Sequence, residues 1–177
     1  MTDNPGDVII RRARTDDAVR LGDLGALLVE EHYTFDALRF IAPTAETPRR
    51  YGAFLTSQLD APDTLILVAE RAGRVIGYGY AALQGFDYMA LRGPAAVLQD
   101  LIIEPESRGR GVGGRLLAAI LEEMRDRGAP RIVLSTAWRN EGAQRLFERT
   151  GFRKTMVEMT LELTDASNQG AEGTKKE

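Results

Sequence analysis

Hydrophobic and polar positions change their spacing several times along the chain, and each change predicts a new element. Short runs rich in aliphatic and β-branched residues predict strands at 8–11, 64–71, 74–80, 95–104 and 131–136. Apolar positions at helical intervals predict helices at about 15–31, 44–60, 112–127 and 140–150. Two further runs, 152–154 and 157–163, predict a final β-hairpin. The order of these elements predicts an α/β fold.

Two connections predict how the strands pair. Ala72 and Gly73 separate two β-rich runs, which is typical of an antiparallel hairpin. The run 95–104 is apolar almost throughout, so it is predicted to be a buried central strand. It is followed by an amphipathic helix and the strand 131–136, in a stretch with the length of a right-handed βαβ unit, whose two strands are parallel. We therefore expect a sheet of mixed direction.

Composition narrows the class of protein. The 177 residues are 44% hydrophobic and 28% charged, which is typical of a soluble protein with one domain. We expect that domain over residues 1–164 and a flexible polar C-terminal tail at 165–177. The absence of cysteine excludes disulfides and thiol nucleophiles. A net charge of -3, with no apolar run long enough for a membrane helix and no signal peptide, predicts a cytoplasmic protein without nucleic acid or membrane partners.

A glycine-rich turn carries the strongest chemical signal. Residues 108–114 read RGRGVGG and lie between a predicted buried strand and a predicted helix. The first N–H groups of a helix have no partner within it, and glycine lets a phosphate approach the backbone closely. Arg108, Arg110 and Arg115 add local positive charge. We interpret the turn as a phosphate-binding site; a glycine-rich connector with solvated arginines is the alternative.

Three phosphate-binding motifs compete for this turn, and residue spacing argues against two of them. Gly109, Gly111 and Gly114 satisfy G-x-G-x-x-G, but the acidic residue that a dinucleotide fold needs about twenty positions later is missing from 131–139. The nucleoside triphosphate loop fits Gly109 and Gly114, but Arg115 replaces its lysine.

The third motif is a family resemblance. Arg108-x-x-Gly111-x-Gly113 resembles the Q/R-x-x-G-x-G/A signature of the GCN5-related N-acetyltransferases, the GNAT family, and residues 140–152, NEGAQRLFERTGF, resemble a second family segment. The resemblance covers about residues 8–164. It implies a GNAT-type fold: a mixed, mostly antiparallel sheet flanked by helices, with a parallel, splayed strand pair in the centre. It also implies direct transfer of an acetyl group from acetyl-CoA to a primary amine in a ternary complex, without a metal.

The resemblance assigns the residues that bind the coenzyme. Main-chain groups of Leu101, Ile102 and Ile103 are expected to pair with the pantetheine arm. The pyrophosphate is expected on the backbone N–H groups of the turn, which comprises Arg108, Gly109, Arg110, Gly111, Val112, Gly113 and Gly114. Asn140 is expected at the pantetheine or thioester end, and Phe147 beside the sulfur.

Amine chemistry adds a carboxylate to these expectations. A lysine-like amine with a pKa of about 10.4 is neutral about once in 2,500 molecules at pH 7, which costs roughly 4.6 kcal/mol. Asp100 interrupts an apolar strand and is the first candidate base, with a water-facing strand edge as the alternative. Glu104 is the second, with a solvated strand end as the alternative. Glu31 and Tyr33 are expected near the amine substrate, whereas His32 is more typical of a helix end than of a base.

Two positions depart from the family pattern. Phe147 stands where many members have a tyrosine proposed to protonate the departing thiolate, and Ser135 where some have a glutamate base. A thiol with a pKa near 8.5 is a tolerable leaving group, so slower transfer is expected. The alternative is a coenzyme-binding sensor without catalysis. Aromatic residues in the loops 32–48 and 85–94 suggest an apolar wall for a small-molecule or peptide amine, and a homodimer is common in the family.

Overall fold

The computed structural model describes residues 8–163, and the tail predicted at 165–177 lies outside them. The strands are β1 (Val8–Arg12), β2 (Thr64–Arg71), β3 (Arg74–Gln84), β4 (Ala95–Ile103) and β5 (Ile132–Leu134). The helices are η2 (Thr15–Asp17), α1 (Ala18–Phe35), α2 (Thr47–Ser57), η3 (Pro105–Ser107), α3 (Val112–Asp126) and α4 (Glu141–Arg149). Each strand and helix predicted before residue 151 is present, with ends that differ by a few residues.

The strands form one sheet in the order β1-β2-β3-β4-β5. Neighbours from β1 to β4 are antiparallel, and β4 and β5 are parallel. The mixed, mostly antiparallel sheet with a parallel pair is therefore confirmed. The β2–β3 turn holds Ala72 and Gly73 at φ of 49° and 79°, because a two-residue hairpin turn that matches the twist of its strands needs positive φ.

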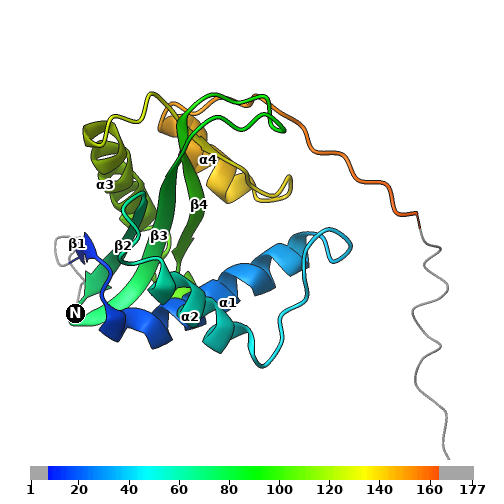
Figure 1. The fold of residues 1–177 in the computed structure, drawn as a ribbon. Helices are drawn as coiled ribbons and strands as arrows, with labels where there is room; N and C mark the ends of the chain where they lie inside the picture. The colour runs from blue at the N-terminus through cyan, green and yellow to red at the C-terminus, as the bar shows by residue number, and fades with distance from the viewer. Residues whose placement is uncertain (1–7, 164–177) are drawn as a thin grey trace, which may run out of the picture.

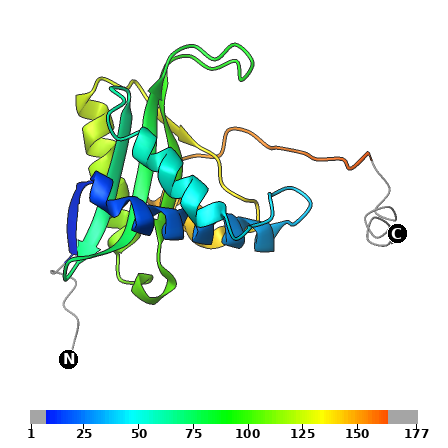
Figure 2. The same cartoon turned by 60° about the horizontal axis from the view of Figure 1, so that its bottom comes forward.

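Helices cover both faces of the sheet (Figures 1 and 2). The amphipathic helix α3 lies on one face and buries Leu116, Leu117 and Ile120 completely. On the other face, α1 buries Leu21 and α2 buries Leu55. Successive residues of β2 alternate between these two apolar clusters, as the pleat of a strand requires. Within residues 8–163, no helix is both long and apolar enough to cross a bilayer.

Glycines bring α1 and α2 into close contact. A Cβ at Gly52 of α2 would lie 2.6 Å from the carbonyl oxygen of Ala18 in α1. A Cβ at Gly25 of α1 would lie 2.2 Å from Cδ1 of Tyr51 in α2. The Tyr51 ring therefore rests on the backbone of α1, where a larger residue would displace it.

β4 and β5 separate partway along β4. Their parallel pairing covers only Ala96–Leu98 against Ile132–Leu134. The pairing of β4 with β3 shifts register so that Gln99 has no partner, and such a bulge bends a strand. From Gln99 onward, β4 pairs with β3 on one side and with no strand of the described chain on the other. The expected splay between the parallel strands follows from this divergence.

The final hairpin predicted at 152–154 and 157–163 is wrong. Residues 152–163 form no helix or strand, and they lead away from the body of the molecule after α4 (Figures 1 and 2). The apolar side chains between 156 and 163 are exposed. An alternating pattern shows which residues favour burial, but it does not show which strand buries them. Because no strand is added beside β5, the parallel pair lies at one edge of the described sheet rather than in its centre.

Candidate active site

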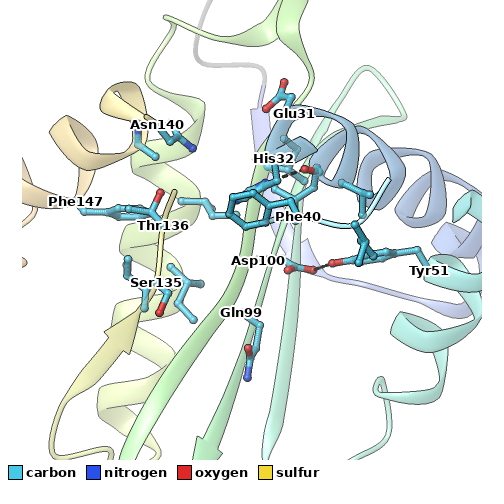
Figure 3. Close-up of a pocket in the computed structure, with 18 residues that line it drawn as sticks. Glu31, His32, Phe40, Tyr51, Gln99, Asp100, Ser135, Thr136, Asn140 and Phe147 are labelled. Carbon is cyan, nitrogen blue, oxygen red and sulfur yellow. Dashed lines mark hydrogen bonds between the residues drawn. The ribbon is translucent and has the colours of Figure 1, made fainter. Parts of the chain in front are cut away.

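A cavity of about 310 Å³ lies where β4 and β5 separate. Its walls come from α1, the loop after α1, α2, β4, the end of β5 and α4 (Figure 3). The lining residues are Leu28, Val29, Glu31, His32, Phe40, Ile41 and Tyr51 on the first side, Leu98, Gln99, Asp100, Leu101 and Ile102 on β4, and Leu134, Ser135, Thr136, Asn140, Ala143 and Phe147 on the second side. In Figure 3, Asp100 lies between Tyr51 on one side and Asn140 with Phe147 on the other.

Asp100 is a buried carboxyl group at this cavity and is 8% exposed. Its Oδ2 accepts hydrogen bonds from the hydroxyls of Tyr51 at 2.9 Å and Tyr78 at 2.8 Å. Burial raises the pKa of Asp100, and the two tyrosine hydrogen bonds and the nearby His32 oppose that rise. Both phenols bond to one oxygen, which leaves Oδ1 for a ligand. A carboxylate with a raised pKa is a better proton acceptor near neutral pH than an ordinary aspartate.

Tyr51 and Tyr78 hold Asp100 from two different elements, α2 and β3. Burial and then the charge of Asp100 raise the pKa of both phenols. Both therefore stay protonated and act as hydrogen-bond donors. Sequence reasoning placed neither tyrosine at the site.

The end of α1 supplies His32 and Glu31 to the cavity, whereas Tyr33 does not line it. His32 Nδ1 lies 2.8 Å from the carbonyl oxygen of Leu28. Because a carbonyl oxygen only accepts, Nδ1 carries the proton, and Nε2 is an acceptor when the ring is neutral. The carboxylate of Glu31 accepts a hydrogen bond from Arg108 at 2.5 Å. Glu31 is therefore already charge-paired, unlike Asp100.

Only the first of the two aromatic loops reaches the cavity. Phe40 and Ile41 form part of its wall, and Phe40 packs edge-on against His32 with ring centroids 5.0 Å apart. The loop at 85–94 contributes no lining residue. Its Phe86 and Tyr88 stack on each other at 6.1 Å and are mostly exposed. The apolar wall expected from both loops therefore comes from one of them.

The second side of the cavity is built on α4. Asn140 Oδ1 accepts a hydrogen bond from the N–H of Ala143 at 3.1 Å, so Asn140 caps the helix as predicted. Its side-chain amide hydrogens remain as donors toward a ligand. Phe147 is buried and packs against Phe152 with ring centroids 5.7 Å apart. The structure thus brings Asn140 and Phe147 to the same cavity as Asp100.

The glycine-rich turn starts α3 with the geometry of an anion site. Gly109 and Gly111 have φ of 74° and 78°, a conformation that glycine adopts without strain. A Cβ at either position would meet no atom of the described chain within 4 Å. Gly111 is the N-cap of α3, and no side chain caps this helix, so its first N–H groups remain for a ligand. A Cβ at Gly113 would lie 3.7 Å from Ile103 and 3.6 Å from Leu146. Residues adjacent in sequence to Ile103 and to Leu146 line the cavity, so the turn lies close to it.

Arginine side chains hold this turn in place. Arg108 donates from Nε to the carbonyl oxygen of Ile103 at 2.7 Å and from Nη2 to Glu31 at 2.5 Å. Arg115 donates from Nη2 to the carbonyl oxygen of Val8 at 2.8 Å. These bonds connect the turn to β4, α1 and β1. Because both side chains already have hydrogen-bond partners, the turn would bind an anion mainly through its backbone N–H groups.

Glu104 does not line the cavity. It is 4% exposed, and its Oε2 lies 2.5 Å from Nη2 of Arg20 and 2.8 Å from Nη2 of Arg74. Its Oε1 accepts a hydrogen bond from the Ser107 hydroxyl at 2.9 Å. Both oxygens are thus occupied by an ion-pair cluster that joins α1, β3 and the end of β4. The structure separates Glu104 from the site that contains Asp100.

Comparison with known proteins identifies the family. The family model described as "Acetyltransferase (GNAT) family" matches residues 29–152. YhfO of Bacillus subtilis, described as an uncharacterized N-acetyltransferase, is 30% identical over 145 residues, which cover 82% of this chain and 89% of that protein. The chain therefore belongs to the GNAT family of acetyltransferases, whose general chemistry is acyl transfer.

Solved structures share the fold. A tetramutant of the BH1408 protein from Bacillus halodurans has a TM-score of 0.74 at 22% identity, covering 88% of this chain and 99% of that one. A predicted acetyltransferase from Clostridium acetobutylicum, solved with acetyl-CoA, has a TM-score of 0.65 at 20% identity, covering 88% of this chain and 96% of that one. At 22% and 20% sequence identity, this structural similarity is evidence for the fold alone.

Proposed function

We propose that this protein transfers an acetyl group from acetyl-CoA directly to a primary amine of a small molecule or peptide. The observation that carries the proposal is Asp100, a buried carboxyl group held by two phenols in a cavity beside an uncapped, glycine-led helix. Membership of the GNAT family supports acetyl transfer, and the Clostridium acetobutylicum neighbour supports acetyl-CoA as the donor.

The donor side of the site fits acetyl-CoA, which supplies a thioester-activated acetyl group. The backbone N–H groups of 109–114 would hold the diphosphate, because the glycine conformations leave that surface open.

The free edge of β4 would pair with the amides of the pantetheine arm. The N–H of Glu104 bonds to the Ile76 carbonyl oxygen on β3, and bonded positions alternate along an antiparallel pair, so the main-chain groups of Ile102 also face β3 rather than the free edge. Those of Leu101 and Ile103 face the free edge. The Ile103 carbonyl already accepts from Arg108, so Leu101 and the N–H of Ile103 are best placed for that pairing. Asn140 would donate its side-chain amide near the thioester.

The acceptor side must provide a neutral amine. An amine with a pKa of about 10.4 needs roughly 4.6 kcal/mol to lose its proton at pH 7. Asp100 would accept that proton at Oδ1 while Tyr51 and Tyr78 hold Oδ2. Asp100 passes this first proton to solvent, and the neutral amine nitrogen then bonds to the carbonyl carbon as the bond from that carbon to sulfur breaks. The nitrogen now carries one proton more than an amide. Asp100 accepts this second proton at Oδ1 and releases it to solvent, which leaves a neutral amide and the departed thiolate, so charge and atoms balance.

Phe147 cannot protonate the thiolate, and among residues 8–163 Tyr51 is the only tyrosine that lines the cavity. Its raised pKa makes Tyr51 a donor of hydrogen bonds rather than of a proton. The thiolate would therefore leave unaided, as its pKa near 8.5 allows.

The cavity favours a cationic amine on a short apolar chain. The hydrogen-bond partners of Asp100 are two neutral phenols, whereas Glu31 is paired with Arg108. Phe40 and Ile41 provide an apolar wall beside it. An ammonium group would be drawn to Asp100 and would lose its proton there, with its carbon chain against this wall.

An assay of free thiol release tests the proposal. The protein is mixed with acetyl-CoA and each of a panel of amines: lysine side chains, polyamines, aminoglycosides and peptide N-termini. We expect thiol release with at least one of them. Binding of acetyl-CoA without thiol release on the whole panel would favour a coenzyme sensor. Failure to bind acetyl-CoA, measured as the absence of ligand-induced stabilisation, would contradict both functions.

A further inference from the structure

Protons taken up by Asp100 during acetyl transfer must reach the solvent from a buried site. Asp100 is 8% exposed, and its Oδ2 is occupied by the hydroxyls of Tyr51 and Tyr78. Its Oδ1 is where the amine would bind, with the carbon chain of that amine against Phe40 and Ile41. The bound amine therefore covers the oxygen from which the protons must leave. A second group that takes each proton from Asp100 would restore the carboxylate for its next step.

The residues that line the cavity offer few groups for this task. Among those lining residues, the titratable ones are Glu31, His32, Tyr51 and Asp100. Glu31 is paired with Arg108, so taking a proton would cost it that ion pair. Tyr51 keeps its own proton, because burial raises the pKa of its phenol. His32 is the lining residue that can take a proton from Asp100 without losing a bond it already makes.

The imidazole of His32 has one nitrogen bonded to its own helix and the other available. Nδ1 donates to the carbonyl oxygen of Leu28, one turn earlier in α1, at 2.8 Å. Phe35 and Phe40 pack edge-on against the ring, with centroid distances of 5.9 Å and 5.0 Å. Within residues 8–163, Nε2 has no hydrogen-bond partner. Figure 3 shows the ring in the same cavity as Asp100, on the α1 side. A neutral His32 therefore presents an unoccupied acceptor to this cavity.

The charges around the ring favour movement of a proton to it. A positive charge on His32 lowers the pKa of Asp100, so a proton on the ring helps Asp100 to stay a carboxylate. The lining residues include no lysine or arginine that would repel an imidazolium. The other titratable or charged groups near the ring are paired or neutral: Glu31 with Arg108, Arg39 with Glu158, and the phenol of Tyr51.

Building on the function proposed above, we propose that His32 is the proton-exit residue of this site. Neutral Nε2 takes the proton from Oδ1 of Asp100 through cavity water, which restores the carboxylate and leaves an imidazolium. The cavity, at about 310 Å³, has room for water beside a short amine, since one water fills about 30 Å³. The imidazolium then releases the proton from Nε2 to bulk water, while Nδ1 keeps its own proton on Leu28. His32 acts through Asp100 and does not contact the amine.

Nuclear magnetic resonance of the ring tests the proposal without any assay of activity. His32 is the single histidine of the 177 residues, so every imidazole signal of the protein belongs to it. The ¹⁵N chemical shifts of the neutral ring should show the proton on Nδ1 and none on Nε2. A neutral ring protonated at Nε2 would have no acceptor facing the cavity and would overturn the proposal.

Steady-state thiol release with the best amine measures the contribution of His32. His32→Asn keeps a donor for the Leu28 carbonyl but removes Nε2. We expect kcat to fall about 10-fold, less than the 10²–10⁴-fold typical of a general base, because solvent can still reach Asp100 slowly. Acetyl-CoA should stabilise this variant as much as the wild type. An unchanged kcat would overturn the proposal. Absence of thiol release by the wild type on every amine would instead overturn the proposed function, and this proposal with it.

Free imidazole separates a proton carrier from a residue that only supports the cavity wall. His32→Ala leaves a hole that imidazole can fill, and its kcat should rise toward the wild-type value with the concentration of neutral imidazole. Phe40→Ala is the matched control, because it opens a neighbouring hole in the same wall without removing a nitrogen. Imidazole should leave its kcat unchanged. No response of His32→Ala, or an equal response of both variants, would overturn the proposal.

Discussion

Asp100 and Glu104 lie on or just after the same strand, and both are buried, at 8% and 4% exposure, yet their surroundings differ. Asp100 is bonded to two neutral phenols and faces a cavity. Glu104 is bonded to two guanidinium groups and a hydroxyl, away from the cavity. Burial alone does not make a carboxylate reactive. A neutral environment that raises its pKa, with one oxygen left for a ligand, is what separates a candidate base from a structural ion pair.

The largest expected effect is on the chemical step at Asp100. Asp100→Asn keeps the shape and can still accept both phenol hydrogen bonds, but it cannot take a proton. We expect kcat for acetyl transfer to fall by about 10²–10⁴-fold, the usual contribution of a general base. Steady-state thiol release measures it. An Asp100→Asn variant with wild-type kcat on its best amine would remove Asp100 from the mechanism.

The second effect is on stability at Glu104. Glu104→Gln leaves Arg20 and Arg74 without their counter-charge. Because Arg74 is already mostly exposed to solvent, we expect the free energy of unfolding to fall by about 3 kcal/mol, the lower end of the range for breaking a buried ion pair. Urea denaturation measures it. Under conditions where the variant is folded, kcat should be unchanged; a loss as large as that of Asp100→Asn would erase the distinction between the two carboxylates.

A third effect tests how Asp100 is held. Gly25→Ala places a Cβ 2.2 Å from the Tyr51 ring, so the ring must move and its bond to Asp100 must weaken. We expect a loss of about 1–3 kcal/mol in stability, as for other overpacked sites. Gly142→Ala in α4 is the control, because its Cβ would meet nothing in the described part of the chain closer than 4.0 Å. It should gain up to about 1 kcal/mol from helix propensity. Equal changes in both variants would show that Tyr51 does not depend on Gly25.

The smallest effect is a pH dependence of stability. The pKa of Asp100 is higher in the folded protein than in the unfolded chain, because burial disfavours its charge. The folded state therefore takes up this proton first as pH falls. The unfolding free energy of the wild type relative to Asp100→Asn should rise as pH falls through the raised pKa, and level off below the ordinary aspartate value. Denaturant melts across mildly acidic pH measure the difference, and a fall over that range would contradict the assigned direction.

Much of the fold follows from local sequence. Periodicity located β1 to β5 and α1 to α4 because each has a regular apolar face and recognisable ends, such as Asn140 before α4 and Gly128 after α3. The hairpin after Gly151 was predicted by the same reasoning and is wrong. Apolar and polar residues do alternate in this segment. A strand also needs a neighbouring strand to pair with, and the sequence of the segment does not show which strand that is.

The site was predictable only where a residue's role depends on its neighbours in sequence. The turn at 108–114 and the cap at Asn140 are local motifs, and the structure gives both the expected geometry. Asp100 stood out because a charge in an apolar strand needs a reason. Its phenol partners could not be foreseen, because Tyr51 and Tyr78 lie 49 and 22 residues away and reach it only through tertiary packing. Glu104 was a candidate base as well, because the tertiary contacts that distinguish its surroundings from those of Asp100 cannot be deduced from the sequence.

One pair of glycine variants tests directly whether backbone N–H groups at the turn bind the diphosphate of acetyl-CoA. Gly111 and Gly73 have nearly equal φ, 78° and 79°, and a Cβ at either would meet no atom of residues 8–163 within 4 Å. Gly111→Val and Gly73→Val should therefore cause similar backbone strain, but only Gly111 lies at the proposed site. At about a hundredfold excess over Kd, acetyl-CoA should stabilise the wild type and Gly73→Val by about 2.7 kcal/mol. Gly111→Val should lose that gain, and full stabilisation of Gly111→Val would contradict this binding mode.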